Sequence, residues 1–123
     1  MTRRAALLSA GVAGFSGIAL GAFGAHALKA VLETHNAREI WSTAVLYHLV
    51  HSVALLWAAE SAVCRRGIIL CWTSGIAVFS GSLYLLALTG ISWLGAVTPV
   101  GGLLLMAGWI LVVSAAILYQ KEE

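Results

Sequence analysis

The sequence predicts an all-α integral membrane protein: a four-helix bundle that forms one domain over residues 1–123, with both termini in the cytoplasm. The first observation is composition, since 61% of the 123 residues are hydrophobic and only 10% are charged, against roughly 45–50% and about 25% in soluble domains. The second is four uncharged stretches close to the roughly 20 residues that a bilayer requires. They are residues 5–25, 40–59, 68–89 and 99–119. Backbone groups in lipid must be satisfied within each segment, so each stretch is expected to be a helix.

The first stretch follows Arg3-Arg4 and ends near Ala25-His26-Ala27, which also fits a signal peptide with a small-x-small cleavage site. Its apolar run is longer than the usual core of about 7–15 residues in a signal peptide. We therefore expect a retained first helix. Cleavage before Leu28 is the alternative, and it would leave three spans.

The connections indicate where the other helices begin. Residues 27–34 are expected to form a short interfacial helix. Asn36 with Glu39 resembles a capping box that opens the second spanning helix. Arg65-Arg66 lies in a tight turn before the third, and Thr98-Pro99 reads as an N-cap followed by proline at the first position of the fourth.

Positive charges near helix ends predict the orientation, because they are retained on the cytoplasmic side. With both termini inside, the inner face carries Arg3, Arg4, Arg65, Arg66 and Lys121, and the outer face carries Lys29 and Arg38. Trp41 and Trp93 then fall at outer helix ends, where an aromatic belt is expected. Cys64 and Cys71 lie near the reducing side and lack CxxC spacing, so we expect them to be unpaired. A net charge of +2 without a long basic run excludes a nucleic-acid partner.

Glycines recur along one side of the first helix. The stripe consists of Gly11, Gly14, Gly17, Gly21 and Gly24. Spacings of three and four keep these residues on one side of a helix, where a neighbouring backbone can approach closely. Packing inside the bundle is the favoured interpretation, and contact with a second copy or a partner subunit is the alternative.

Polar residues within the spans mark the candidate site. Tyr47, His48, His51 and Ser52 share one face of the second helix, which is expected to point into the bundle. The third helix offers a matching face with Thr73, Ala77, Ser80, Gly81 and Tyr84. Glu60 borders the second span, and Arg65 or Arg66 is its expected partner.

Four chemical roles for the histidines can be compared with this pattern. His48 and His51 share one helix and cannot both ligate one haem, while His26 lies nearer the surface. Zinc would need further ligands at the same depth, and a di-iron site would need inward carboxylates. A quinone or another lipophilic ligand held by His and Tyr hydrogen bonds is chemically feasible. The favoured interpretation is hydrogen bonding between helices, without metal or cofactor.

Four motifs in order resemble one family. They are Gly21-Ala22-Phe23-Gly24-Ala25-His26, Tyr47-His48-x-x-His51 after Trp41-Ser42-Thr43-Ala44, Phe79-Ser80-Gly81-Ser82-Leu83-Tyr84, and Thr98-Pro99-Val100-Gly101-Gly102 with Gly108-Trp109. Together they are similar to the YgdD/YwdK-like small inner-membrane proteins, a domain-of-unknown-function family with relatives in animal mitochondria. The resemblance implies four spans, a retained first helix and an inner-membrane location. It implies no reaction, substrate or cofactor, and it leaves open the roles of the motif residues His26, Tyr47, His48, His51, Ser80, Tyr84, Thr98 and Pro99.

Two functional hypotheses follow. The first is a non-catalytic structural or accessory subunit of a larger membrane assembly, since the sequence contains no Asp, nucleophile elbow, phosphate loop or zinc-protease motif. The second is a protein that binds or transports a small lipophilic or protonatable ligand through Tyr47, His48 and His51.

Overall fold

The computed structural model describes residues 2–61 and 66–119. The helices are α1 (Arg3–Ala25), α2 (Lys29–Thr34), α3 (Arg38–Glu60), α4 (Arg66–Thr89) and α5 (Leu94–Tyr119). All of these except α2 are long and apolar enough to cross a membrane. This confirms the all-α class and the four spanning helices.

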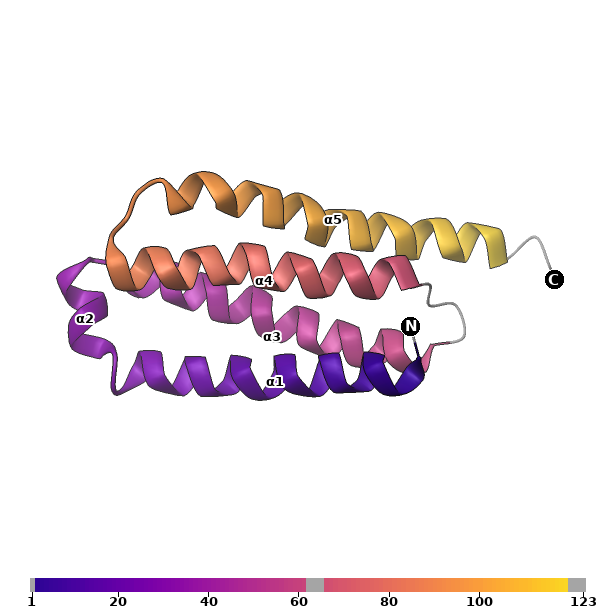
Figure 1. Ribbon diagram of the computed structural model, residues 1–123, viewed down its shortest axis with the longest axis horizontal. Helices are drawn as coiled ribbons and strands as arrows, with labels where there is room; N and C mark the ends of the chain where they lie inside the picture. Colours follow the sequence, from indigo (N-terminus) through magenta and orange to yellow (C-terminus); the bar gives the residue numbers. More distant parts are fainter. Residues whose placement is uncertain (1, 62–65, 120–123) are drawn as a thin grey trace.

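The long helices pack as antiparallel neighbours in chain order (Figure 1). α1 lies against α3, α3 against α4, and α4 against α5, so α3 and α4 form the inner pair. The start of α1 and the end of α5 lie at one end of the molecule, and α2 lies at the other. The two termini therefore share one side, and the side on which they lie stays a prediction.

The expected short helix over residues 27–34 is present as α2, which begins two residues later, at Lys29, and ends at Thr34. Two expected helix starts are wrong. The N-cap of α3 is Ala37, which has no capping side chain, so the expected capping box of Asn36 and Glu39 is absent; Asn36 instead turns the chain with a positive φ of 48°. Helix α5 already begins at Leu94, because a turn starting at Ile91 leads directly into it.

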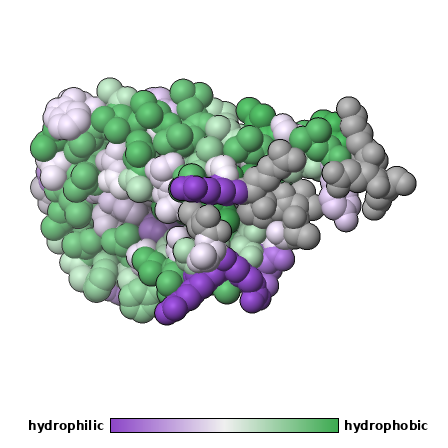
Figure 2. Space-filling view, turned by 45° about the vertical axis from the view of Figure 1, so that its right-hand side comes forward, coloured by the Kyte–Doolittle hydropathy of each residue, from purple (hydrophilic) through white to green (hydrophobic). Residues whose placement is uncertain are grey.

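The interior consists of two apolar clusters along the bundle. One contains Leu55, Trp72 and Leu105, and the other contains Trp41 and Tyr84. The expected position of Trp41 in an aromatic belt is wrong, because its ring packs on Tyr84 and only 4% of the residue is exposed. The outer surface is mainly hydrophobic, as a lipid-facing surface must be, and strongly hydrophilic side chains gather near the end turned toward the viewer in Figure 2.

The ends of α1 and α3 are joined by an ion pair. Arg3 donates to both carboxylate oxygens of Glu60, at 2.7 and 2.9 Å. The expected pairing of Glu60 with Arg66 is therefore replaced by one between helices that are neighbours in space. Arg65 and Cys64 lie outside the described residues, and Cys71 is a free thiol.

Candidate functional site

The inward face of α3 carries the polar residues of the candidate site. His48, His51 and Ser52 are buried, because their spacing places them on the side of α3 that meets its neighbours. Tyr47 differs from the expectation for this face, since 42% of it is exposed and its ring lies 4.7 Å from that of Phe79. The site is therefore built around the two imidazoles.

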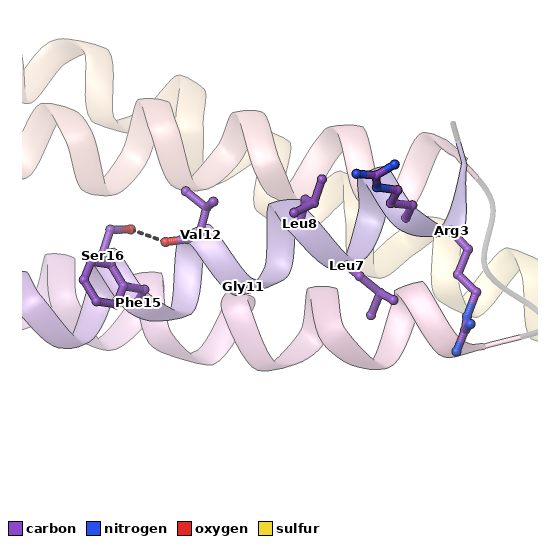
Figure 3. A pocket seen from close by; sticks show the side chains of 8 residues that line it. Arg3, Leu7, Leu8, Gly11, Val12, Phe15 and Ser16 are labelled. Carbon is purple, nitrogen blue, oxygen red and sulfur yellow. Dashed lines mark hydrogen bonds between the residues drawn. The ribbon is translucent and has the colours of Figure 1, made fainter.

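His48 links three helices. Its Nδ1 lies 3.0 Å from the Tyr84 hydroxyl of α4, and its Nε2 lies 3.3 Å from Oγ of Ser16 in α1. The Ser16 hydroxyl donates to the Val12 carbonyl at 2.8 Å, as Figure 3 shows, so its oxygen accepts from His48 Nε2–H. Nδ1 of the neutral ring then accepts from Tyr84, and one directed chain of hydrogen bonds runs from α4 to α1.

His51 contacts α5 rather than α1. The indole N–H of Trp109 in α5 donates to His51 Nε2 at 3.1 Å. A neutral imidazole then carries its proton on Nδ1, which donates to the Tyr47 carbonyl at 2.8 Å. Both nitrogens of His51 are engaged within the protein, and the two histidines point to different neighbours rather than to one shared site.

Further hydroxyls bond between the helices. Ser80 of α4 donates to the Ala44 carbonyl of α3 at 2.8 Å, and both residues are buried. Ser82 and Thr98 join α4 to α5 through their hydroxyl oxygens at 2.7 Å. Thr98 therefore has a role in packing α5 rather than in capping it. Together with the histidine contacts, these bonds connect each long helix to its neighbours.

The face expected on α4 is divided. Ser80 and Tyr84 are buried in the bundle, whereas Thr73 and Ala77 are exposed. Thr73 and Ala77 line a groove of about 440 Å³ between α1 and α4. His48 and Ser16 also line this groove, so its wall includes the α1 end of the His48 chain.

The glycine stripe of α1 is divided as well. A Cβ added at Gly17 would meet Leu49 of α3 at 2.7 Å, one at Gly21 would meet Val45 at 3.3 Å, and one at Gly24 would overlap Trp41. At Gly11 and Gly14 an added Cβ would meet nothing within 4 Å. The second half of the stripe packs against α3, and the first half faces open space.

Several of these partners were not identified from the sequence. They are Ser16, Trp72 and Trp109. The rings of Trp72 and Trp109 are tilted against each other with centroids 4.8 Å apart, and the His51 ring lies 6.1 Å from each of them. His26 lies apart from the cluster: it is exposed and ends α1 through its backbone N–H. Within residues 2–61 and 66–119, no three His, Cys, Asp or Glu side chains are grouped to hold a metal. A Cβ at Gly108 would overlap the Trp72 ring, a close fit that depends on how α5 packs on α4 and that the sequence does not reveal.

Comparison with known proteins identifies the family. Residues 20–102 match the family described as protein of unknown function (DUF423). The chain belongs to the DUF423 family. This DUF423 protein is 42% identical to the UPF0382 membrane protein YwdK of Bacillus subtilis, over 83% of this chain and 87% of the relative. It is 40% identical to the UPF0382 inner membrane protein YgdD of Escherichia coli K12, over 99% of this chain and 96% of the relative.

A third relative is likewise named as a UPF0382 membrane protein. A UPF0382 membrane protein of Staphylococcus haemolyticus, SH2409, is 40% identical over 78% of this chain and 81% of its own length. No solved structure matches the chain. With its four spanning helices, this DUF423 protein is a multi-pass protein of the inner membrane.

Proposed function

We propose that the protein is a non-catalytic accessory subunit that docks onto a larger membrane assembly through the outer face of α1. The observation that carries the proposal is the open half of the glycine stripe, where a Cβ added at Gly11 or Gly14 would meet nothing within 4 Å in the described part of the chain. Glycine within a helix lowers helix stability by about 0.8–1.0 kcal/mol relative to alanine, yet it permits a second helix to approach closely. A partner helix would use the space that α3 leaves free.

The surroundings of Gly11 suit a packed helix. A groove of about 620 Å³ surrounds it on the outer face of α1 (Figure 3). Its middle is lined by Leu7, Leu8, Val12 and Phe15, and its ends by Arg3 and Arg4 and by Ser16. Van der Waals packing against small residues drives helix association in lipid, because lipid tails are as apolar as leucine. An apolar groove with glycine at its base therefore favours a transmembrane helix as the occupant.

The absence of catalysis is part of this proposal. The imidazole nitrogens of His48 and His51 are used in bonds between helices or to the backbone. The described glutamates Glu33, Glu39 and Glu60 lie at helix ends, away from these rings. No described carboxylate is thus placed to exchange a proton with either histidine.

Native gel electrophoresis of mildly solubilised native membranes tests the proposal. We expect the wild-type chain to migrate with a discrete partner, far above its 12.9 kDa mass. Gly11→Leu would fill the groove and is expected to release the chain from that band. Gly81→Leu is the matched control, since Gly81 also faces open space but lies on α4. A clean monomer, or a complex that contains only this chain, would contradict the proposal.

A second candidate function is the binding or transport of a small lipophilic or protonatable ligand. Tyr47, His48 and His51 were expected to share this role, but Tyr47 packs against Phe79, and neither Tyr47 nor His51 lines the groove between α1 and α4. The specific observation in favour of this function is His48, which lines the groove between α1 and α4. The candidate ligand site is therefore reduced to His48 and its neighbours on α1 and α4.

A further inference from the structure

The groove between α1 and α4 has walls suited to a lipid-soluble molecule. Its sides include Leu8, Val12, Leu55 and Ile76, and its volume of about 440 Å³ lies within the usual 300–1,000 Å³ of small-molecule sites. Exposed α1 side chains such as Val12 place its mouth on the lipid-facing surface. A ligand can therefore enter sideways from the bilayer.

The depth and charge of the groove restrict the head group of that ligand. His48 lies near the middle of α3, about equally far from Arg38 and Glu60. Among the described residues that line the groove, none is charged. An anionic head group there would lose its hydration without gaining a counter-charge, so the groove favours a neutral molecule.

The polar side chains that line the groove are Ser9, Ser16, His48 and Thr73. The Ser9 and Ser16 hydroxyls donate to carbonyls of their own helix, but the Thr73 hydroxyl has no hydrogen bond among the described residues. His48 Nε2–H reaches Ser16 at 3.3 Å, which is longer than the usual 2.7–3.2 Å of an N–H···O bond. A ligand with two acceptor oxygens would accept from Thr73 with one and share the His48 Nε2–H with Ser16 through the other.

We propose that this groove binds a lipid-soluble quinone, with one carbonyl oxygen at His48 and the other at Thr73. A quinone is neutral, carries two acceptor oxygens on opposite sides of a flat ring, and has an apolar tail that remains in lipid. Thr73 lies one helical turn from Ala77 on α4, and both residues line the groove together with His48. The proposal rests on the second candidate function. Leu8, Val12 and Ser16 line both this groove and the docking groove on α1, so the two proposals are tested by separate readouts.

Photoaffinity labelling tests this site. The purified full chain is placed in quinone-free lipid nanodiscs, and an azido derivative of a short-tail ubiquinone is the probe. We expect covalent label on the segments of α1 and α4 that line the groove, located by mass spectrometry. Excess decylubiquinone should remove the label, whereas dodecane, which has no carbonyl, should not.

Three variants test whether the labelled probe lies in the groove. Ala77→Leu fills it and is expected to lower labelling about tenfold. Thr73→Val removes one donor at similar volume and is expected to weaken binding about threefold. Ala116→Leu, on the exposed side of α5, is the matched control and should label like the wild type.

The outcomes separate the two proposals. Equal labelling of wild type and Ala77→Leu, at equal melting temperature, would overturn the quinone site, and so would displacement by dodecane. A label restricted to other helices would also overturn it. If the high-mass complex on native gels survives in Ala77→Leu while labelling is lost, the quinone site stands without affecting the docking proposal.

Discussion

Each buried imidazole has both ring nitrogens in a hydrogen bond, and this fixes its tautomer. His51 accepts from Trp109 and donates to the Tyr47 carbonyl, while His48 accepts from Tyr84 and donates to Ser16. A neutral ring can satisfy each set of partners, whereas a charged ring would need an acceptor at every nitrogen. The histidines are therefore suited to joining helices in their neutral form.

Removal of the Trp109 indole N–H tests the contribution of one such bond. Trp109→Phe leaves His51 Nε2 without its donor, in a residue that is only 5% exposed. Hydrogen bonds between membrane helices are worth about 0.6 kcal/mol on average and up to about 1.7, so we expect the free energy of unfolding to fall by roughly 1 kcal/mol. Unfolding by SDS titration in mixed micelles measures it.

The control for that measurement is Trp57→Phe. Trp57 is 48% exposed, so its loss should change the free energy of unfolding by no more than about 0.5 kcal/mol. Equal stability of the two variants would show that the Trp109–His51 bond contributes nothing.

Residues differ in how far the sequence predicts their roles. His48 and His51 could be assigned to a buried face, because position along a helix depends only on residue spacing. Their partners Ser16 and Trp109 could not, since a contact between helices also depends on the rotation and relative height of each helix. Arg3 and Glu60 are far apart in sequence, and only the packing of α1 on α3 brings them together.

At the scale of whole helices, glycine sets the distance between α4 and α5. A Cβ at Gly101 would overlap the backbone nitrogen of Phe79 and would lie 2.6 Å from its Cα. The contact is with backbone rather than with a flexible side chain, so it can be relieved only by moving the helices apart.

Gly101→Ala is therefore expected to destabilise the protein by about 1–3 kcal/mol, the usual cost of overpacking. Gly81→Ala is the matched control, because a Cβ there would meet nothing within 4 Å. Both changes gain the same helix propensity, so the difference between their SDS unfolding free energies isolates the packing at Gly101. A difference close to zero would contradict the close approach of the two helices.

The start of α5 shows where local sequence rules fail in a membrane. Thr98-Pro99 has the pattern of a helix start, yet the helix begins at Leu94 and Pro99 lies inside it. Pro99 cannot donate to the Gly95 carbonyl, but membrane helices tolerate such a proline where neighbouring groups satisfy the backbone. The bond of Thr98 to Ser82 holds this part of α5 on α4, a contact that local sequence cannot reveal.

For the whole molecule, the antiparallel order of four spans places the start of α1 and the end of α5 on one side. That end carries Arg3, Arg4 and Arg66, whereas the opposite end carries Lys29 and Arg38. Arg38 also lies 3.7 Å from Glu33, and both side chains are exposed. The excess of arginine at the terminal end predicts that this end lies in the cytoplasm.

Reporter fusions in the bacterial inner membrane measure this orientation. A green fluorescent protein joined to the C-terminus should fluoresce and an alkaline phosphatase there should be inactive, because each reporter is active on only one side. The matched fusion carries the phosphatase at Ser92, in the exposed turn between α4 and α5, and should be active. The reverse pattern would place the C-terminus outside, and activity at both positions would contradict α5 as a membrane span. Since the arginines near the termini carry the signal, replacing Arg3, Arg4 and Arg66 with glutamine should increase phosphatase activity at the C-terminus while lowering it at Ser92.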